Sequence, residues 1–363
     1  MDKKKLIYIM GGLMGVMILF IVVIATVSSC SNKKQSYEKI ESTLTNAAIS
    51  YFNDNSSSLP NSESASVTVE AGTLSSGGYM KELSKMVEEG VSCSAKVIVT
   101  KSGDNYLYSP VLNCGDNYKT NKLSDVVMGN NPVTTTGAGL YKSEDLYVFK
   151  GEFINNYVEL DKKLWRILDI DSEGYARLIY AGPSTEETYV WDDRYNVDTK
   201  ESVGINDYSV SRIKDTLLSL DTNNQYITAE TKTKLAYRNW CVGKRSDSNK
   251  ALNNDEECAT TVSGQLFGLP YVSDYVNASI DSNCTTIEDQ SCNNYNYLLS
   301  SSLSSWTLTG SKEKSSKVYA VSRSRYSITN ASNEKAIRPT VYLSNNVMYA
   351  DGDGSETNPY TIK

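Results

Sequence analysis

Few residues in this chain have the types and spacing that catalysis or ligand binding requires. Its 363 residues include no histidine, which removes the commonest general base and every histidine-dependent triad. In the stretch Thr188–Tyr195, aromatic and charged side chains are interleaved. An aromatic ring can stack on a sugar or a cation while neighbouring carboxylates accept hydrogen bonds. We therefore predict Trp191, Asp192 and Asp193 as ligand contacts, with a structural role as the alternative.

Two further acidic patterns bear on metal binding and hydrolysis. Asp351-Gly-Asp-Gly354 begins like a calcium loop, but the twelfth position holds Ile362, where an EF-hand needs glutamate. We expect a tight turn there instead. The adjacent acids Glu186-Glu187 and Asp192-Asp193 could serve hydrolysis, although neighbouring carboxylates are usually exposed. The sequence predicts no metal site and no cofactor.

The cysteines indicate an oxidising compartment. The segment from Cys93 to Cys114 can fold as a β-hairpin about Gly103-Asp104, which places the two thiols opposite each other. Such a cross-strand disulfide persists only outside reducing surroundings. For four other cysteines the alternative is a zinc site, but the chain has no Cys-x-x-Cys pair and no histidine. The predicted disulfides are Cys93–Cys114, Cys241–Cys258 and Cys284–Cys292.

An uncharged apolar run from Leu6 to Val27 follows three lysines near the N-terminus. As a helix it would be about 33 Å long, enough to cross a bilayer core of about 30 Å. The lysines favour a cytoplasmic N-terminus. We expect a single-pass plasma-membrane protein whose C-terminal domains are extracellular. In the alternative, Val27-Ser-Ser-Cys30 is a lipobox, and Cys30 is lipidated after cleavage.

Charge argues against nucleic acid as a partner. The formal net charge is −7 and the sequence pI is about 5.0, without a sustained basic stripe. One local basic cluster is interpreted as a solvated face rather than a polyanion site. Its members are Lys312, Lys314, Lys317, Arg323 and Arg325.

The elements that must position these residues form an α+β protein of two modules. After a membrane anchor, residues 1–30, a small α+β module is expected over 31–122. Its predicted elements are a helix over 34–53, a strand over 66–70, a helix over 79–89 that ends at Gly90, and the disulfide-linked hairpin. Residues 123–139, rich in glycine and threonine, are predicted to be a linker.

The second domain is expected over residues 140–363 and holds all four tryptophans. Trp165 and Trp306 alternate with apolar neighbours and are predicted core residues. An amphipathic helix is expected over 210–220, and a short one over 273–279 with Ser273 as N-cap. A long polar segment lies between Trp240 and Trp306. Strands are predicted at both ends of the domain, over 157–160, 164–168, 176–180, 317–321 and 338–343.

Five sequence segments of this second domain follow one another in this order: Asn155–Ile167, Phe267–Ala278, Trp306–Thr309, Ile337–Leu343 and Gly352–Tyr360. Together they resemble an uncharacterised domain of surface proteins of gut Bacillota. That domain is similar to the C-type-lectin-like and formylglycine-generating-enzyme-like folds, and the resemblance covers about residues 140–363. The membrane-proximal module faintly resembles a pilin, but it lacks the pilin processing motif.

The resemblance implies that the first and last strands meet and that long loops face a ligand. We therefore expect a lectin-like domain for ligand binding or adhesion, with an unidentified glycan or protein as ligand. The calcium-dependent sugar site of lectins is not expected, because neither Glu-Pro-Asn nor Gln-Pro-Asp occurs. One alternative is an extracytoplasmic oxidase or hydrolase, in which Cys284 and Cys292 would be a redox-active or copper-binding pair. Another is a structural component of a pilus-like or secretion assembly.

Overall fold

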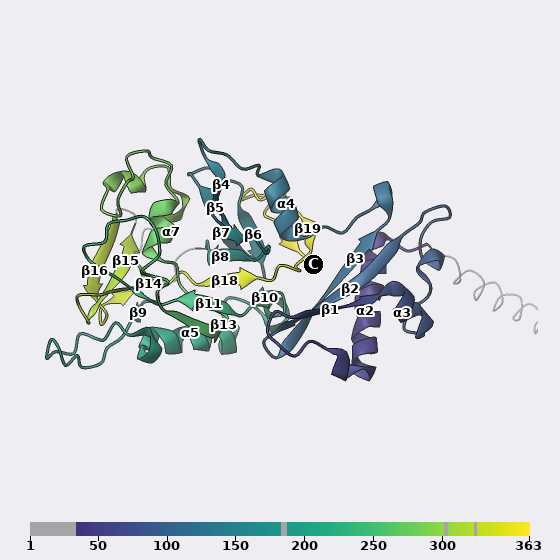
Figure 1. Ribbon diagram of the computed structural model, residues 1–363, viewed down its shortest axis with the longest axis horizontal. Helices are drawn as coiled ribbons and strands as arrows, with labels where there is room; N and C mark the ends of the chain where they lie inside the picture. Colours follow the sequence, from purple (N-terminus) through teal and green to yellow (C-terminus); the bar gives the residue numbers. More distant parts are fainter. Residues whose placement is uncertain (1–33, 183–186, 301–303, 323–324) are drawn as a thin grey trace, which may run out of the picture. The chain divides into compact units, whose positions relative to one another are not determined.

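The computed structural model describes residues 34–182, 187–300, 304–322 and 325–363 (Figure 1). It is a mixed α/β fold with three disulfides. Contacts divide the chain into two compact units. The first unit comprises 34–59, 68–98 and 110–120, and the second comprises 60–67, 99–109 and 121–363.

The predicted membrane span, Leu6–Val27, and Cys30 lie outside the described residues. Among the residues that the structure does describe, no helix has the length and apolar character needed to cross a membrane.

Helix α2 (Tyr37–Asp54) dominates the first unit and matches the predicted helix closely. Its apolar residues recur at three- and four-residue steps, so they form one face, and that face is buried: Ile40, Leu44, Ala47, Ala48 and Phe52. The hydroxyl of Ser36 caps the helix by accepting a hydrogen bond from the backbone N–H of Lys39. On the same helix, the buried carboxylate of Glu41 accepts hydrogen bonds from the hydroxyls of Tyr118 and Thr120.

The predicted hairpin is confirmed. Strands β2 (Ser94–Ser102) and β3 (Asn105–Asn113) are joined by a two-residue turn in which Gly103 has φ of 57°. The Cys93–Cys114 disulfide closes the open end of this hairpin. Strand β1 (Ser66–Glu70) pairs with β2, so β3 lies at an edge of the three-stranded sheet, where Pro110 is tolerated.

Two predicted segments near the hairpin differ from the structure. The helix expected over 79–89 is wrong: helix α3 (Ala71–Ser76) ends before the Gly77-Gly78 pair, and only a short 3₁₀ turn, η2 (Leu83–Lys85), follows. The linker expected over 123–139 begins instead with helix α4 (Leu123–Asn130). Leu123 and Val127 are buried one helical turn apart, whereas the glycine- and threonine-rich composition starts only near the end of this helix.

The second unit is built on an antiparallel sheet with the order β10-β18-β8-β7-β5-β4, and β6 also pairs with β7. Its strand bounds are β4 (Gly139–Ser143), β5 (Leu146–Lys150), β6 (Tyr157–Leu160), β7 (Lys163–Asp171), β8 (Ala176–Tyr180), β10 (Leu235–Ala236) and β18 (Thr340–Leu343). The C-terminal strand β18 lies beside β8, with Thr340 opposite Ile179. Elements from both ends of the unit therefore share one sheet.

A second sheet has the order β12-β14-β15-β16. Its strands are β12 (Lys244–Arg245), β14 (Ser305–Ser311), β15 (Lys317–Ser322) and β16 (Arg325–Asn330). Three two-stranded pairs complete the unit: β11 (Arg238–Cys241) with β13 (Thr261–Gln265), β9 (Tyr189–Val190) with β17 (Glu334–Lys335), and β19 (Tyr349–Asp351) with β20 (Thr361–Ile362). The helices are α5 (Arg212–Asn223), α6 (Ala229–Lys232) and α7 (Val272–Asn277), and short 3₁₀ turns include η4 (Tyr208–Val210), η5 (Gln290–Asn293) and η6 (Tyr297–Ser300).

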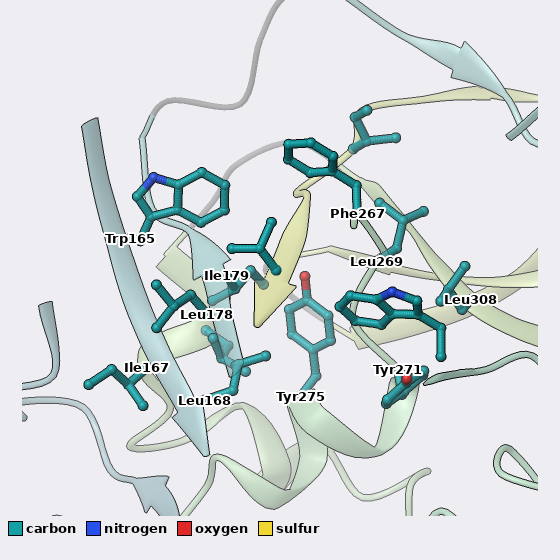
Figure 2. Close-up of a cluster of buried hydrophobic side chains, with 14 of the residues drawn as sticks. Trp165, Ile167, Leu168, Leu178, Ile179, Phe267, Leu269, Tyr271, Tyr275 and Leu308 are labelled. Atoms are coloured by element: carbon teal, nitrogen blue, oxygen red, sulfur yellow. The ribbon is translucent and has the colours of Figure 1, made fainter. Parts of the chain in front are cut away.

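Residues from both sheets and from α7 form the core of the second unit. Trp165 and Trp306 are completely buried, as predicted, and so are the other two tryptophans. Figure 2 shows Tyr275 of α7 between side chains of β7 and β8 on one side and side chains of the 267–271 segment and β14 on the other. Helix α7 begins one residue earlier than predicted, and its N-cap is Tyr271 rather than Ser273. The carboxylate of Asp274 accepts a hydrogen bond from the backbone N–H of Tyr271 and so caps the helix.

Asp161 in the β6–β7 turn holds the start of helix α6. Its carboxylate accepts hydrogen bonds from the backbone N–H of Thr228 (2.7 Å), the Thr228 hydroxyl (2.9 Å) and the Thr231 hydroxyl (2.8 Å). Burial raises the pKa of Asp161, but these hydrogen bonds outweigh burial, so its pKa lies below the ordinary value. A carboxyl whose pKa falls on folding stabilises the native state above its unfolded pKa, and this contribution is lost as pH falls through the folded pKa.

We therefore expect Asp161→Asn to be less stable than wild type at pH 7. The difference in the free energy of unfolding should shrink as the pH falls below about 4, the ordinary range of an aspartate. Urea unfolding of both proteins at a series of pH values measures it. A difference that stays constant down to pH 2 would assign the effect to side-chain geometry rather than to charge.

Candidate functional site

The predicted ligand contacts Trp191, Asp192 and Asp193 do not form one surface. The indole of Trp191 is fully buried and donates a hydrogen bond to the carbonyl of Thr307 (3.2 Å). Asp192 is fully buried too, and its carboxylate accepts hydrogen bonds from Arg194 and from the backbone N–H of Ile205. Trp191 and Asp192 thus have structural contacts, and only Asp193 is exposed.

The other patterns singled out in the sequence also have local structural contacts. In the Asp351–Gly354 turn, Asp351 accepts a hydrogen bond from the backbone of Gly352, whose φ is 99°. Across the described ranges, no three histidine, cysteine, aspartate or glutamate residues lie close enough to hold a metal ion. Glu187 accepts a hydrogen bond from the hydroxyl of Tyr189, whereas Glu186 lies outside the described residues. In the basic cluster, Lys314 pairs with Asp247, and Arg323 is outside the described residues.

The three predicted disulfides are present. Cys241–Cys258 and Cys284–Cys292 both lie in the long polar segment between Trp240 and Trp306. The first joins β11 to the segment before β13. The second closes a short loop before and within η5, where Cys292 is buried. They fix a segment with few regular elements, and this segment supplies part of the cleft described next.

A polar cleft of about 420 Å³ opens between the β4–β5 hairpin, the strands β7 and β8, the 253–255 loop and helix α7. We call it the Arg177 cleft, after the guanidinium at its inner end. Carboxylates outnumber cations along its walls. Its lining residues are Ser143, Glu144, Asp145, Leu146, Val148, Phe149, Lys150, Leu168, Asp169, Arg177, Asn253, Asn254, Asp255, Ser273, Asp274, Asn277 and Tyr297.

The inner end of the cleft is a buried charge triad. Arg177 donates to Asp169 on the neighbouring strand (Nε–Oδ2 2.9 Å) and to Asp274 at the start of α7 (Nη1–Oδ2 3.0 Å). The three side chains are each less than a tenth exposed. Burial lowers the pKa of Arg177, but the two carboxylates outweigh burial and raise it well above the ordinary value. With one guanidinium against two carboxylates, the ionised triad is negative and its geometry is fixed by charge-assisted hydrogen bonds.

A second buried ion pair contacts two residues that line the cleft, Asn253 and Ser273. Arg245 of β12 is 1% exposed and forms an ion pair with the equally buried Glu257. Its guanidinium donates to the carbonyls of Ala251 (2.6 Å) and Asn253, and these hydrogen bonds fix the backbone of the 249–253 segment. Glu257 also accepts a hydrogen bond from the hydroxyl of Ser273, which lines the cleft. Burial raises the pKa of Glu257 above its ordinary value despite the charge of Arg245.

One cation other than Arg177 lines the cleft. Lys150, at the end of β5, extends over the ring of Tyr141, with 5.4 Å from its Nζ to the ring centroid. Burial lowers the pKa of Lys150. Glu144, Asp145 and Asp255 lie at the mouth, where they are exposed. The cleft therefore offers fixed acceptors inside, amide groups on one wall and exposed carboxylates at the rim, which suits a ligand rich in hydrogen-bond donors.

Sequence reasoning missed this cleft, although a signal for its inner end exists. Asp169 and Arg177 interrupt the apolar strands Lys163–Asp171 and Ala176–Tyr180. Charged residues inside such runs are rare unless they are paired, so each one indicates a partner. Comparison with known proteins adds no assignment: no family model, no curated protein and no solved structure matches the chain.

Proposed function

We propose that this chain is a membrane-anchored, extracytoplasmic surface protein whose second unit binds a polar ligand, a glycan or a protein segment, in the Arg177 cleft. The observation that carries this proposal is the cleft itself, a concave polar site whose inner end is held rigidly by the Arg177 triad. Rigid polar groups that converge in a concavity are typical of small-ligand and glycan sites.

The location outside the cytosol has two supports. The run from Leu6 to Val27 is long and apolar enough to anchor the chain. Six of the seven cysteines form disulfides, and such bonds persist in oxidising surroundings. The N-terminal lysines favour a cytoplasmic N-terminus, and the two units would then lie outside the membrane.

A C-type-lectin-like fold is our interpretation of the second unit. Its support is the pairing of β18 with β8, which joins both ends of the unit in one sheet, together with the long irregular segment between Trp240 and Trp306. That segment contributes the 253–255 wall of the cleft. Loops on a rigid sheet are the usual place for binding residues.

The geometry favours binding over the oxidase or hydrolase alternative. Both inner carboxylates of the cleft, Asp169 and Asp274, are engaged by one guanidinium, so neither is available as a general acid or base without breaking the triad. The Cys284–Cys292 bond closes a short loop, and Cys292 is buried, which suits a structural disulfide.

The test is a screen of the full chain, in detergent, on arrays of glycans and bacterial or host surface proteins. A ligand found there should lose at least about tenfold in affinity to a Glu144→Gln/Asp255→Asn variant, because each charged hydrogen bond contributes about 1.5–3 kcal/mol. Both residues are exposed, so stability should not change. Glu230→Gln, an exposed change on α6 outside the cleft, is the matched control. Unchanged affinity in the double variant would place the ligand elsewhere and overturn the cleft assignment.

A further inference from the structure

A second concavity of about 680 Å³ lies on the same unit, and we call it the Arg166 basin. It is open, and polar side chains form most of its surface. Its lining residues are Glu152, Arg166, Asn293, Asn294, Tyr295, Asn296, Tyr297 and Leu299. Tyr297 lines both the basin and the Arg177 cleft, so the two sites are neighbours.

Arg166 is the residue of the basin whose burial and contacts indicate an anionic ligand. It lies in the middle of strand β7 and is only 6% exposed. Its Nε donates to the side chain of Asn156 (2.7 Å), and its Nη2 donates to the carbonyl of Ile154 (3.3 Å). Both acceptors are neutral. Among the residues that the structure describes, no carboxylate forms an ion pair with this guanidinium, in contrast to Arg177 and Arg245.

Burial makes the charge of Arg166 costly, and two aromatic rings offset only part of that cost. The rings of Tyr157 and Tyr297 flank the guanidinium, with their centroids 4.3 and 4.4 Å from its central carbon. Burial lowers the pKa of Arg166 and outweighs Tyr157, Tyr297 and the more weakly acting Glu356, which raise it, and the charge of Arg338 lowers it as well. Arg338 is itself buried, and it donates hydrogen bonds to the carbonyls of Tyr180 and Leu298. Two buried cations near each other, bonded to neutral acceptors, are stabilised by an external anion.

The flanking tyrosines also decide what kind of anion fits. They flank the guanidinium while its Nε and Nη2 donate to Asn156 and Ile154, and among the described residues its Nη1 donates to no acceptor. A carboxylate matches a guanidinium fork with two parallel hydrogen bonds. A carboxylate that lay in the basin would thus meet a cation whose orientation is already set.

The remaining walls of the basin suit a sugar. Tyr295 is 58% exposed, and Phe153, which follows the lining residue Glu152 in the neighbouring loop, is 88% exposed. Exposed aromatic rings can stack on the apolar face of a pyranose, while amide groups and the carboxylate of Glu152 meet its hydroxyls.

The loop that presents Tyr295 is rigid. The amide of Asn296 donates to the carbonyls of Tyr275 (2.5 Å) and Cys292 (2.8 Å). The backbone N–H of Tyr297 donates to the carbonyl of Gly151 (3.0 Å), which ties this loop to the one that carries Glu152 and Phe153. Because these hydrogen bonds already order the loop, the loop loses little conformational entropy when a ligand binds.

We infer that the Arg166 basin binds a carboxylated saccharide, with the sugar carboxylate on Arg166 and the pyranose ring against Tyr295. The inference concerns a site separate from the Arg177 cleft, so either one can fail without the other.

The test uses the full chain in detergent and titrates it with a galacturonate oligomer and with the methyl ester of the same oligomer, which keeps the sugar and removes the charge. Isothermal titration should show saturable binding of the acid, at least about tenfold tighter than the ester, because a charged hydrogen-bonded pair contributes about 1.5–3 kcal/mol. Equal affinity for acid and ester would overturn the inference. Binding of inorganic phosphate alone would overturn it as well.

Four variants test the contributions of the aromatic ring, the guanidinium and the neighbouring cleft. Tyr295→Ala changes an exposed ring, so it should leave the urea midpoint unchanged and weaken acid and ester alike by about fivefold or more. Arg166→Gln should remove the preference for the acid over the ester. Because that buried change can also disturb folding, Arg166→Lys, which keeps the charge but loses the planar fork, is measured beside it and should reduce the preference. Asp255→Asn, in the Arg177 cleft, should leave the affinity for galacturonate within about twofold of wild type. Unaltered binding by Tyr295→Ala, or an unaltered acid preference in both Arg166 variants, would contradict the assignment.

Discussion

Replacing Arg177 by methionine should destabilise the protein by about 3–5 kcal/mol, the range found when one partner of a buried ion pair is removed. The guanidinium is the common partner of Asp169 and Asp274, and both carboxylates are less than a tenth exposed. Without it, two like charges would face each other at positions where both side chains are almost fully buried. The free energy of urea unfolding, with the disulfides intact, measures this effect.

Arg212→Met is the matched control for that substitution. Arg212 forms an ion pair with Asp193, and both side chains are about half exposed. An exposed pair contributes about 0–1 kcal/mol, so the same change of residue should have little effect there. If Arg177→Met were no more destabilising than Arg212→Met, the inner end of the cleft would not be held by charge, and its proposed rigidity would be wrong.

Replacing Arg245 by methionine should also lower the free energy of unfolding by about 3–5 kcal/mol, but it should affect a different segment of the chain. The change leaves Glu257 buried without its cation and removes the donors that hold the carbonyls of Ala251 and Asn253. Amide hydrogen exchange in the 249–253 segment should accelerate more than exchange in β7 and β8. Since Asn253 lines the cleft, ligand affinity should fall as well.

Lys250→Met provides the control in the same segment. Lys250 pairs with Glu288 near the surface, where the two side chains are 34% and 55% exposed. We expect a change of at most about 1 kcal/mol and unchanged exchange in the 249–253 segment. Equal acceleration of exchange in both variants would show that the segment depends on its surface contacts rather than on the buried Arg245–Glu257 pair.

Local sequence signals predicted much of this fold. The hairpin about Gly103-Asp104, helix α2 and the strands β6 and β8 follow from turn chemistry and from apolar periodicity, both of which act over a few residues. The disulfides were predictable for the same reason, since each joins cysteines close in the chain. The helix expected over 79–89 is wrong: only the 3₁₀ turn Leu83–Lys85 forms there, and Met86 and Val87, which follow it, are buried outside any regular helix.

The two proposed binding regions could not be found in this way, because each also depends on residues that are far apart in the chain. Arg177 and Asp274 are 97 residues apart, and only the folded sheet brings them together. Composition drew attention instead to Trp191, whose aromatic and acidic neighbours suggested a surface. The indole of Trp191 is buried because it packs against segments far away in the chain, such as β14, whose Thr307 carbonyl accepts its hydrogen bond. That burial depends on the tertiary structure.

Chemical labelling of intact cells tests the central claim most directly. Thiol alkylation before and after reduction, followed by mass spectrometry, should find Cys93, Cys114, Cys241, Cys258, Cys284 and Cys292 blocked until a reductant is added, and protease added outside the cells should remove both units. Free thiols at these positions in the native protein, or units that survive external protease while a known surface protein is cleaved, would contradict an extracytoplasmic binding protein.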